Sequence, residues 1–313
     1  MFNHFRQTYG STAPAPPLAT SDPLDARRCT VQLQNGHLYL DAIPAPAQAL
    51  LGYDPPRSLE LSGDAVVALI NQMVDGYRCV AIAARQDDVV SVATAMARQR
   101  HGADIEVRIV DAVGDEPTKT PEATLIALEN KSLGRSGRWC ASAGWDRRPD
   151  FVVVGDALSG GAPFAALLAV TNDDTAPAAV TSDSAVLERV GDTIRAVAAE
   201  QLLDQAPPLD RYLRERLNAV RATCGEFGTL EFSPLRAIVT LQSPAAAAKL
   251  KRRLCERGVL VGLDDRGRIV IAPPLVIRAA EIDVISGALR AALMNRAWRP
   301  SLCCPACEAI AAS

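Results

Sequence analysis

The chain has little or none of several patterns on which common functional sites depend. Its three histidines, His4, His37 and His101, lie far apart and predict neither a metal centre nor a pair of nucleophile and base. No apolar run approaches membrane-spanning length, and the N-terminus lacks a cationic start followed by an apolar core. Neither a Walker loop nor a G-x-G-x-x-G fingerprint is present. We therefore expect a cytoplasmic protein with no membrane partner.

Positive charge is also sparse. Only four of the 313 residues are lysines, and the formal net charge is −3. The basic cluster from Lys249 to Arg253 lies on an expected helix, where it predicts a solvated face. This balance argues against a nucleic-acid partner. A hydrophobic content of 49% with 22% charged residues is ordinary for a folded globular protein, so we expect one large domain or two smaller ones.

Composition and turn residues divide the chain into five segments. The first is rich in Pro, Ala, Ser and Thr and predicts a flexible leader, and the second opens with a hairpin pattern around Asn35-Gly36. The third alternates β-branched runs with helical stripes, the pattern of a mostly parallel α/β sheet. The fourth repeats the alternation on a smaller scale, and the fifth is a tail that contains cysteines. The segments are 1–28, 29–58 (the N-terminal part of the small domain), 59–203 (the large domain), 204–299 (the C-terminal small α/β domain) and 300–313.

Short apolar runs and helical stripes give the expected elements of these domains. In the large domain the expected strands are Cys79–Ile82, Ile105–Val110, Ala123–Leu128, Phe151–Val154 and Phe164–Val170. The expected helices there are Asp87–Arg98 and Ser184–Leu203. Pro207-Pro208 predicts a break, after which a helix restarts over Leu209–Ala222. The small domain is expected to contain strands at Leu235–Leu241, Val259–Leu263 and Ile269–Ala272, a helix at Ala245–Glu256 and a last helix with Ile282, Ile285, Leu289 and Leu293 buried.

The most informative stretch runs from Arg148 to Pro163 and reads R-P-D-F-V-V-V-G-D-A-L-S-G-G-A-P. Further blocks are L-G-R-S-G-R-W at Leu133–Trp139, L-C-E-R-G-V-L-V at Leu254–Val261 and I-V-I-A-P-P-L at Ile269–Leu275. In content, order and spacing these blocks resemble class III (ornithine-aminotransferase-like, fold type I) aminotransferases, which depend on pyridoxal phosphate. The resemblance implies a shortened large aminotransferase-like domain followed by a small α/β domain.

The same resemblance assigns roles to positions that no longer carry the required side chains. The imine-forming lysine of the family falls on Asp156, and a carboxylate cannot form a Schiff base. The aspartate that holds the pyridine nitrogen protonated falls on Leu128, in L-I-A-L-E-N-K, where Glu129 follows it. The glutamine that meets the phenolic oxygen falls on Lys131, and the substrate-binding arginine falls on Val270. These positions therefore predict the loss of the covalent chemistry.

Other parts of the implied cofactor pocket have changed as well. The phosphate-binding loop falls on the stretch that includes Arg85, with Gln86 in place of glycine and Asp87 in place of a hydroxyl residue. Arg268, two residues before Val270, could replace the lost arginine in a slipped register. Only residues 111–123 lie where the family has a much longer segment with several strands. We therefore expect a degenerate member of the family that binds no pyridoxal phosphate.

The resemblance leaves three functional hypotheses. We favour a catalytically inactive subunit that pairs with an active aminotransferase homologue in a heterodimer or heterotetramer, with self-association as an alternative. Thr181 and Ser182 are candidates for the interface hydroxyls. The second hypothesis is an anion-binding protein that uses Arg85, Lys131 and Arg268 in the vacated pocket. The third is a divergent pyridoxal-phosphate enzyme with Lys131 as the imine former.

Two further expectations concern local pairing. Lys131 is more simply explained as the salt-bridge partner of Asp156, because both positions face one pocket in the family. Cys303, Cys304 and Cys307 are weak candidates for metal ligands, since three cysteines without a second pair do not complete a zinc site. We favour a tail without a metal.

Overall fold

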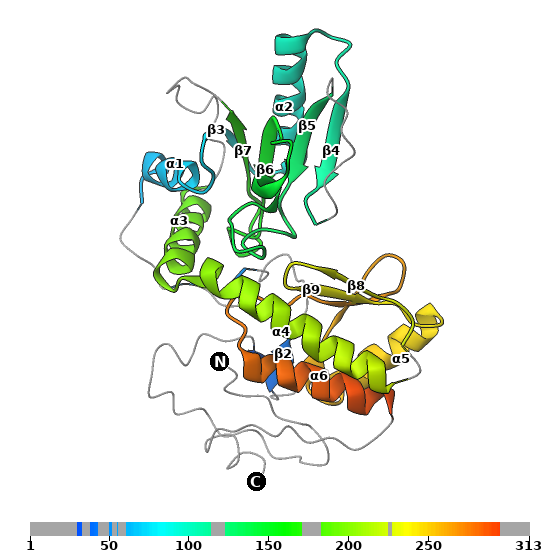
Figure 1. The fold of residues 1–313 in the computed structure, drawn as a ribbon. Coiled ribbons are helices and arrows are strands. Elements are labelled where there is room, and N and C mark those ends of the chain that lie inside the picture. Colours follow the sequence, from blue (N-terminus) through cyan, green and yellow to red (C-terminus); the bar gives the residue numbers. More distant parts are fainter. Residues whose placement is uncertain are drawn as a thin grey trace. The chain divides into compact units, whose positions relative to one another are not determined.

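The computed structural model describes residues 30–32, 38–42, 50–51, 55, 61–113, 123–170, 183–224 and 227–294 (Figure 1). The chain divides into two compact units. One consists of Met1–Ala45 with Pro207–Ser313, and the other of Pro46–Ala206. The larger aminotransferase-like domain was predicted at 59–203, and the structural unit that contains those residues is 46–206. Each unit is described below by itself.

A five-stranded sheet forms the centre of the 46–206 unit, with strand order β3-β7-β6-β5-β4. The strands are β3 (Tyr77–Ala83), β4 (Val107–Asp111), β5 (Thr124–Leu128), β6 (Phe151–Val154) and β7 (Ala165–Val170). All five strands were predicted. The pairs β4–β5 and β5–β6 are parallel, but β7 is antiparallel to both β6 and β3, so the sheet is mixed and not mostly parallel as predicted. The turn from β6 to β7 is short and carries no helix that could return the chain for a parallel pairing.

The sheet is continuous where the connection is shorter than in the family, between β4 and β5. β4 pairs directly with β5, in register from Val107 with Thr124 to Asp111 with Leu128. Both ends of residues 111–123 therefore belong to neighbouring strands, and no gap lies between them in the sheet. β4 is an edge strand, and Ile109 on it is 51% exposed.

Three helices accompany this sheet: α1 (Gly63–Asn71), α2 (Gln86–His101) and α3 (Ser184–Ala199) (Figure 1). On α2, Val89, Ala93 and Ala97 are fully buried at the i, i+4, i+8 spacing and pack against one face of the sheet. The sequence predicted α2 and α3 but missed α1. The signal for α1 is local, because Ser62 caps it by accepting a hydrogen bond from the Ala65 N–H at 3.3 Å.

The predicted break at Pro207-Pro208 is wrong. Helix α4 runs from Leu202 to Thr223 and contains both prolines. The interruption occurs earlier, at Gln201, whose φ of 52° is in the left-handed region. Both prolines lie near the start of α4, where few turns precede the ring and the loss of two backbone donors is tolerated better than in the middle.

The other unit has two small sheets and three helical segments. A four-stranded antiparallel sheet has the order β11-β12-β9-β8, and a three-stranded sheet has the order β1-β2-β10. The strands are β1 (Thr30–Gln32), β2 (Leu38–Asp41), β8 (Leu230–Ser233), β9 (Arg236–Val239), β10 (Val259–Leu260), β11 (Gly262–Leu263) and β12 (Ile269–Ile271). Together with α4, the helices are α5 (Pro244–Cys255) and α6 (Ala279–Leu293).

Most of the small-domain predictions are confirmed. β1 and β2 pair antiparallel as the expected hairpin, although its turn at Asn35-Gly36 lies outside the described residues. The single strand predicted over Val259–Leu263 is divided, because β10 joins β2 while β11 joins β12. β8 was not predicted. No described helix is both long and apolar enough to cross a membrane.

Candidate functional site

Four of the residues singled out in the sequence, Leu128, Glu129, Lys131 and Asp156, lie where β5 and β6 end. Leu128 is the last residue of β5 and pairs with Asp111 at the end of β4 and with Val153 near the end of β6. Glu129 continues directly from β5, and Asp156 follows β6 after one glycine. The carboxyl ends of parallel strands are where open α/β sheets bind ligands, so this edge is the candidate site.

Leu128 is partly buried and packs against the apolar core. Its side chain packs on the sheet face that α2 covers, against a buried cluster that includes Val89, Ile126 and Val153. An apolar side chain at this position extends the alternation of β5, which puts Ile126 and Leu128 on the same face. Leu128 carries no group that could stabilise a positive charge.

Glu129 is a fully buried carboxylate with four hydrogen-bond donors. Oε1 accepts from the Ser142 N–H at 2.8 Å and from Ser142 Oγ at 2.5 Å, and Oε2 accepts from the Ala141 N–H at 3.1 Å and from Ser132 Oγ. Burial, followed by the negative charge of Glu129, raises the pKa of the neighbouring Cys140 thiol well above its usual range. These donors come from both ends of residues 132–142. The carboxylate therefore fixes this loop at the end of β5, and its lone pairs are already used.

Asn130 and Gln86 are in contact, and they connect the end of β5 to the start of α2. Asn130 Nδ2 donates to Gln86 Oε1. Gly155 lies against the same side chain, because a Cβ at Gly155 would lie 2.1 Å from Asn130 Oδ1. The space between the start of α2 and the end of β6 is thus filled by two side-chain amides. Sequence reasoning identified Gln86 but not its partner Asn130, since nothing in the linear pattern joins positions so far apart.

Asp156 begins a tight turn between β6 and β7. Its carbonyl accepts from the Ser159 N–H at 3.1 Å, from Ser159 Oγ at 3.0 Å and from the Gly161 N–H at 2.9 Å. Gly160 and Gly161 have φ values of 65° and 88°, which favour glycine. Burial raises the pKa of the Asp156 carboxyl above its ordinary value, opposed by hydrogen bonds from its own N–H and that of Ala157. The motif segment therefore forms a glycine turn around a carboxyl group.

The predicted salt bridge between Lys131 and Asp156 is wrong. Lys131 Nζ lies 3.0 Å from Asp111 Oδ2, at the end of β4. The strand order explains this choice, because β4 and β6 lie on opposite sides of β5 and the Lys131 side chain extends toward β4. Lys131 is 60% exposed and Asp111 is 43% exposed, so the pair is a surface pair.

The start of α2 carries its own charges. Arg85 is the N-cap residue, its side chain makes no capping hydrogen bond, and its Nη2 lies 3.6 Å from Asp87 Oδ2. Both side chains are highly exposed. Asp87 and Asp88 occupy the first turn, where negative side chains interact favourably with the positive end of the helix dipole. These carboxylates occupy the electrostatic position that an anion would take at a helix N-terminus.

Arg268 and Val270 belong to the other unit. Val270 is buried in β12. Arg268 Nε donates to Asp264 Oδ2 at 2.7 Å, and Nη1 lies 3.1 Å from both carboxylate oxygens of Glu231. The hydrogen bond to Asp264 raises the pKa of the Arg268 guanidinium above its ordinary value. Two carboxylates therefore engage the Arg268 guanidinium, and its replacement of the lost arginine stays a prediction.

The remaining residues of the R-P-D segment have structural roles that sequence reasoning missed. Asp150 Oδ2 accepts from the Leu125 N–H at 2.8 Å, and the Asp150 N–H donates to the Leu125 carbonyl at 2.9 Å. Tyr77 Oη donates to the Pro149 carbonyl at 2.5 Å. Burial raises the pKa of Tyr77 to about 12, so the hydroxyl stays a donor. These contacts set where β6 begins beside β5.

Five candidate residues cannot be placed. Thr181, Ser182, Cys303, Cys304 and Cys307 lie outside the described residues. Within the described part of the chain, no group of three or more His, Cys, Asp or Glu side chains is arranged to hold a metal ion.

Solved structures of aminotransferases have the same fold. The ornithine aminotransferase of Plasmodium yoelii matches with a TM-score of 0.70 at 14% identity, over 89% of this chain and 96% of that one. The ornithine aminotransferase of Toxoplasma gondii matches with a TM-score of 0.69 at 14% identity, over 86% of this chain and 88% of that one. A phospholyase from Arthrobacter matches with a TM-score of 0.69 at 16% identity, over 87% and 94%. The fold is that of fold-type-I aminotransferases.

Sequence comparison identifies the family. The family described as "Aminotransferase class-III" matches residues 118–293, more than half of the chain. The chain therefore belongs to the class-III aminotransferase family, as its motifs predicted. It is 26% identical over 174 residues to acetylornithine aminotransferase 1 of Bordetella pertussis, and 28% identical over 188 residues to ornithine aminotransferase 1 of Staphylococcus aureus. These matches cover 51% and 55% of this chain but only 42% and 44% of the two relatives.

Proposed function

We propose that this chain is a non-catalytic member of the class-III aminotransferase family that does not hold pyridoxal phosphate and that associates with an active aminotransferase homologue. The observation that carries the proposal is Asp156. By the motif resemblance it stands at the position of the imine-forming lysine, in a turn formed with Gly160 and Gly161 and closed by hydrogen bonds to the Asp156 carbonyl. These glycines match the G-G of the family's lysine segment, which supports a true substitution at Asp156 rather than a slipped alignment.

The rest of the site supports the loss of the coenzyme. Where the family holds the protonated pyridine nitrogen, the partly buried Leu128 packs against the apolar core. Where the family has a glycine in its phosphate loop, Gln86 contacts Asn130, and Asp87 adds a negative charge in the first turn of α2. The residues at these positions therefore do not fit pyridoxal phosphate, since Asp156 cannot form the imine, Leu128 cannot contact the pyridine nitrogen, and Gln86 and Asp87 replace the small and hydroxyl residues of the phosphate loop.

The proposed association is supported by the fold, which the chain keeps although the residues for coenzyme chemistry are replaced. The chain keeps the folded framework of the family and its internal anchors, Glu129 and Asp150, which hold the loop and strand ends in place. The matched relatives are ornithine and acetylornithine aminotransferases, so we propose a homologue of this class as the partner. A framework maintained without its reactive groups is expected of a subunit that completes or regulates another chain.

The coenzyme part is tested by titrating the purified chain with pyridoxal phosphate and recording the visible absorbance of a lysine-bound coenzyme. The chain and its Asp156→Lys variant should both show none, because the lysine alone restores neither the pyridine contact nor the phosphate loop. An active class-III aminotransferase is the positive control. Visible absorbance in the unmodified chain that borohydride abolishes, with the coenzyme left covalently attached, would contradict this part.

The association part needs a separate measurement. The chain and a class-III aminotransferase from the same genome are expressed together and separated by size. We expect co-elution and a change in the partner's transaminase activity, whereas an aminotransferase of another family should neither co-elute nor respond. Separate elution with unchanged activity would remove the association while leaving the coenzyme result intact.

The two alternatives are less well supported. An imine at Lys131 requires an amine that is free to react, but this amine lies 3.0 Å from the Asp111 carboxylate on the surface. An anion site built on Arg85, Lys131 and Arg268 requires unpaired cations, and each of the three has a carboxylate partner within its own unit.

A further inference from the structure

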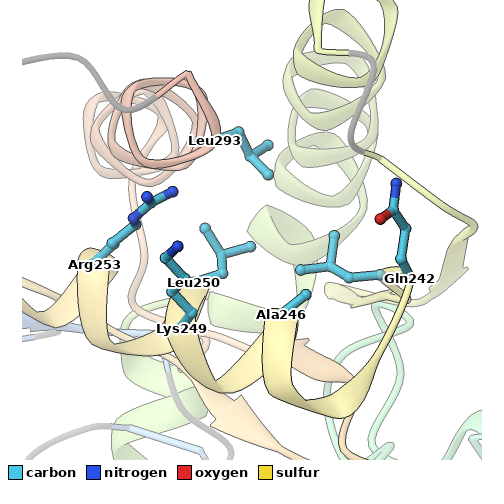
Figure 2. Close-up of a pocket in the computed structure, with 7 residues that line it drawn as sticks. Gln242, Ala246, Lys249, Leu250, Arg253 and Leu293 are labelled. Carbon is cyan, nitrogen blue, oxygen red and sulfur yellow. The ribbon is translucent and has the colours of Figure 1, made fainter.

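A pocket of about 240 Å³ lies beside α5 in the unit that contains α4, α5 and α6. One face of α5 contributes Ala246, Lys249, Leu250 and Arg253, which follow the i, i+3, i+4, i+7 spacing of a single helical stripe. Leu293 enters from the end of α6, and Leu241 and Gln242 come from the segment that precedes α5 (Figure 2). The pocket is thus lined by a helical face, a helix end and a loop.

Two cations face this space without a described carboxylate beside them. Figure 2 shows the side chains of Lys249 and Arg253 extending from α5 to the same side, toward Leu293. In the part of the chain that the structure describes, neither lies within ion-pair distance of an acidic group, whereas Arg252 on the same helix lies 3.9 Å from Glu256. Arg253 donates one N–H to the Ala292 carbonyl at 3.1 Å, which leaves the rest of the guanidinium able to bind an anion. Like charges four residues apart on a helix repel each other, so the pair favours a negative partner.

The rest of the lining defines what such a partner looks like. Leu241, Leu250 and Leu293 give the pocket an apolar wall, and the small side chain of Ala246 leaves room above the helix. Gln242 provides an amide on the side away from the two cations (Figure 2). The volume is below the range of roughly 300–1,000 Å³ for sites that hold drug-sized ligands. A ligand that fits is therefore small and has an anionic end and an apolar stem.

From this arrangement we infer that the α5–α6 pocket binds a small organic carboxylate. Its carboxylate lies between Lys249 and Arg253, its carbon chain packs against Leu250 and Leu293, and Gln242 meets a polar group at the far end when the ligand has one. The site is in a different unit from Asp156 and does not depend on the coenzyme proposal.

The test is calorimetric or NMR titration of the full chain with valerate, a five-carbon carboxylate. We expect saturable binding in the millimolar range that weakens as salt is added, because a charge pair near the surface is screened. Pentanol lacks the charge and acetate lacks the stem, so each should bind at least about tenfold more weakly. Glutarate, which has a second polar end, should bind at least as well as valerate.

Three variants separate this site from general electrostatic attraction. Lys249→Gln should weaken valerate binding roughly tenfold. Arg253→Lys keeps a charge and should weaken it less than Arg253→Gln. Lys251→Gln removes the same charge from an exposed position of α5 that does not line the pocket, and it should bind valerate like the unmodified chain. The inference is overturned by absent binding, by phosphate or acetate binding as tightly as valerate, or by equal effects of Lys249→Gln and Lys251→Gln.

Discussion

The strand ends that the family resemblance identifies and the α5–α6 pocket both gather charged side chains, but they use them differently. At the ends of β4 and β5, Glu129 accepts four hydrogen bonds and Lys131 pairs with Asp111. Beside α5, Lys249 and Arg253 face a cavity with no described acidic neighbour. Charge in the first region holds the chain together, and charge in the second is available to a ligand. The two regions should therefore respond in opposite ways to mutation.

The largest effect is expected at Glu129. Replacing it with alanine leaves buried donors from Ser132, Ala141 and Ser142 without an acceptor, and we expect the free energy of unfolding to fall by about 3–5 kcal/mol. Urea denaturation followed by circular dichroism measures this loss. The milder Glu129→Gln variant should lose less free energy of unfolding, because it keeps one acceptor oxygen. If the alanine variant does not fold, the glutamine variant still shows whether the carboxylate stabilises the chain.

A matched control for this prediction is Glu106→Ala. Glu106 is 59% exposed and pairs with Arg108 at 2.6 Å, so its loss should change stability by less than about 0.5 kcal/mol. If Glu129→Ala lost as little free energy of unfolding as this control, the hydrogen bonds to the buried carboxylate would not stabilise the strand-end region. The contrast with the pocket would then fail.

The second effect is expected at Gly155. A methyl group there would lie 2.1 Å from Asn130 Oδ1, so Gly155→Ala should destabilise the chain by about 1–3 kcal/mol. The double variant with Asn130→Ala should recover most of the loss, because the truncated side chain no longer meets the new methyl group. A double-mutant cycle on unfolding free energies measures this coupling. Strictly additive losses would mean that Asn130 does not fill this space.

A smaller effect of opposite sign is expected at Asp156. Burial raises the pKa of its carboxyl in the folded chain, so the folded state binds a proton more tightly than the unfolded state does. The free energy of unfolding contributed by this group is therefore highest below the ordinary aspartate pKa of about 3.9 and falls as pH rises through the folded value. Asp156→Asn should stabilise the chain at pH 7, by less than about 1 kcal/mol because solvent partly screens the site. Thermal unfolding at pH 7 and at pH 3.5 tests this, since the gain should shrink at the lower pH.

The smallest effect is expected in the pocket. Lys249→Gln removes a like-charge contact with Arg253, so it should leave stability unchanged or raise it by roughly 0.2–0.5 kcal/mol while it weakens carboxylate binding. Denaturation and titration of the same preparation measure both quantities. A clear loss of stability would mean that Lys249 has a structural role, as Glu129 does, and the two regions would no longer differ.

Much of the fold followed from short-range patterns. The five strands of the larger sheet were predicted because each is a short apolar run between turn residues, and α2, α3, α5 and α6 were predicted from their buried stripes. The direction of β7 was not available from its own sequence, because strand direction depends on which neighbours pair. The helix through Pro207 and Pro208 was missed because proline propensity is a local rule that the packing of α4 overrides.

The candidate site shows the same division between local and long-range information. The replacement of the reactive groups at Asp156 and Leu128 could be inferred from motif spacing, because side-chain chemistry needs no partner to be assigned. Partner choice could not be inferred in this way. Lys131 was assigned to Asp156 but contacts Asp111, and the pairing of Arg268 with Asp264 and Glu231 was not predicted.

The sequence by itself determined the family of this chain, and it is also the source of the prediction that the groups required for its relatives' chemistry are lost, since both depend on residue identity and spacing along the chain. The tertiary structure decided which charges neutralise each other, because residues such as Glu129 and Ser142, or Lys131 and Asp111, meet only after the strands align. It also brought Lys249, Arg253 and Leu293 around one cavity, since only the packing of α6 beside α5 turns a basic helical face into a pocket.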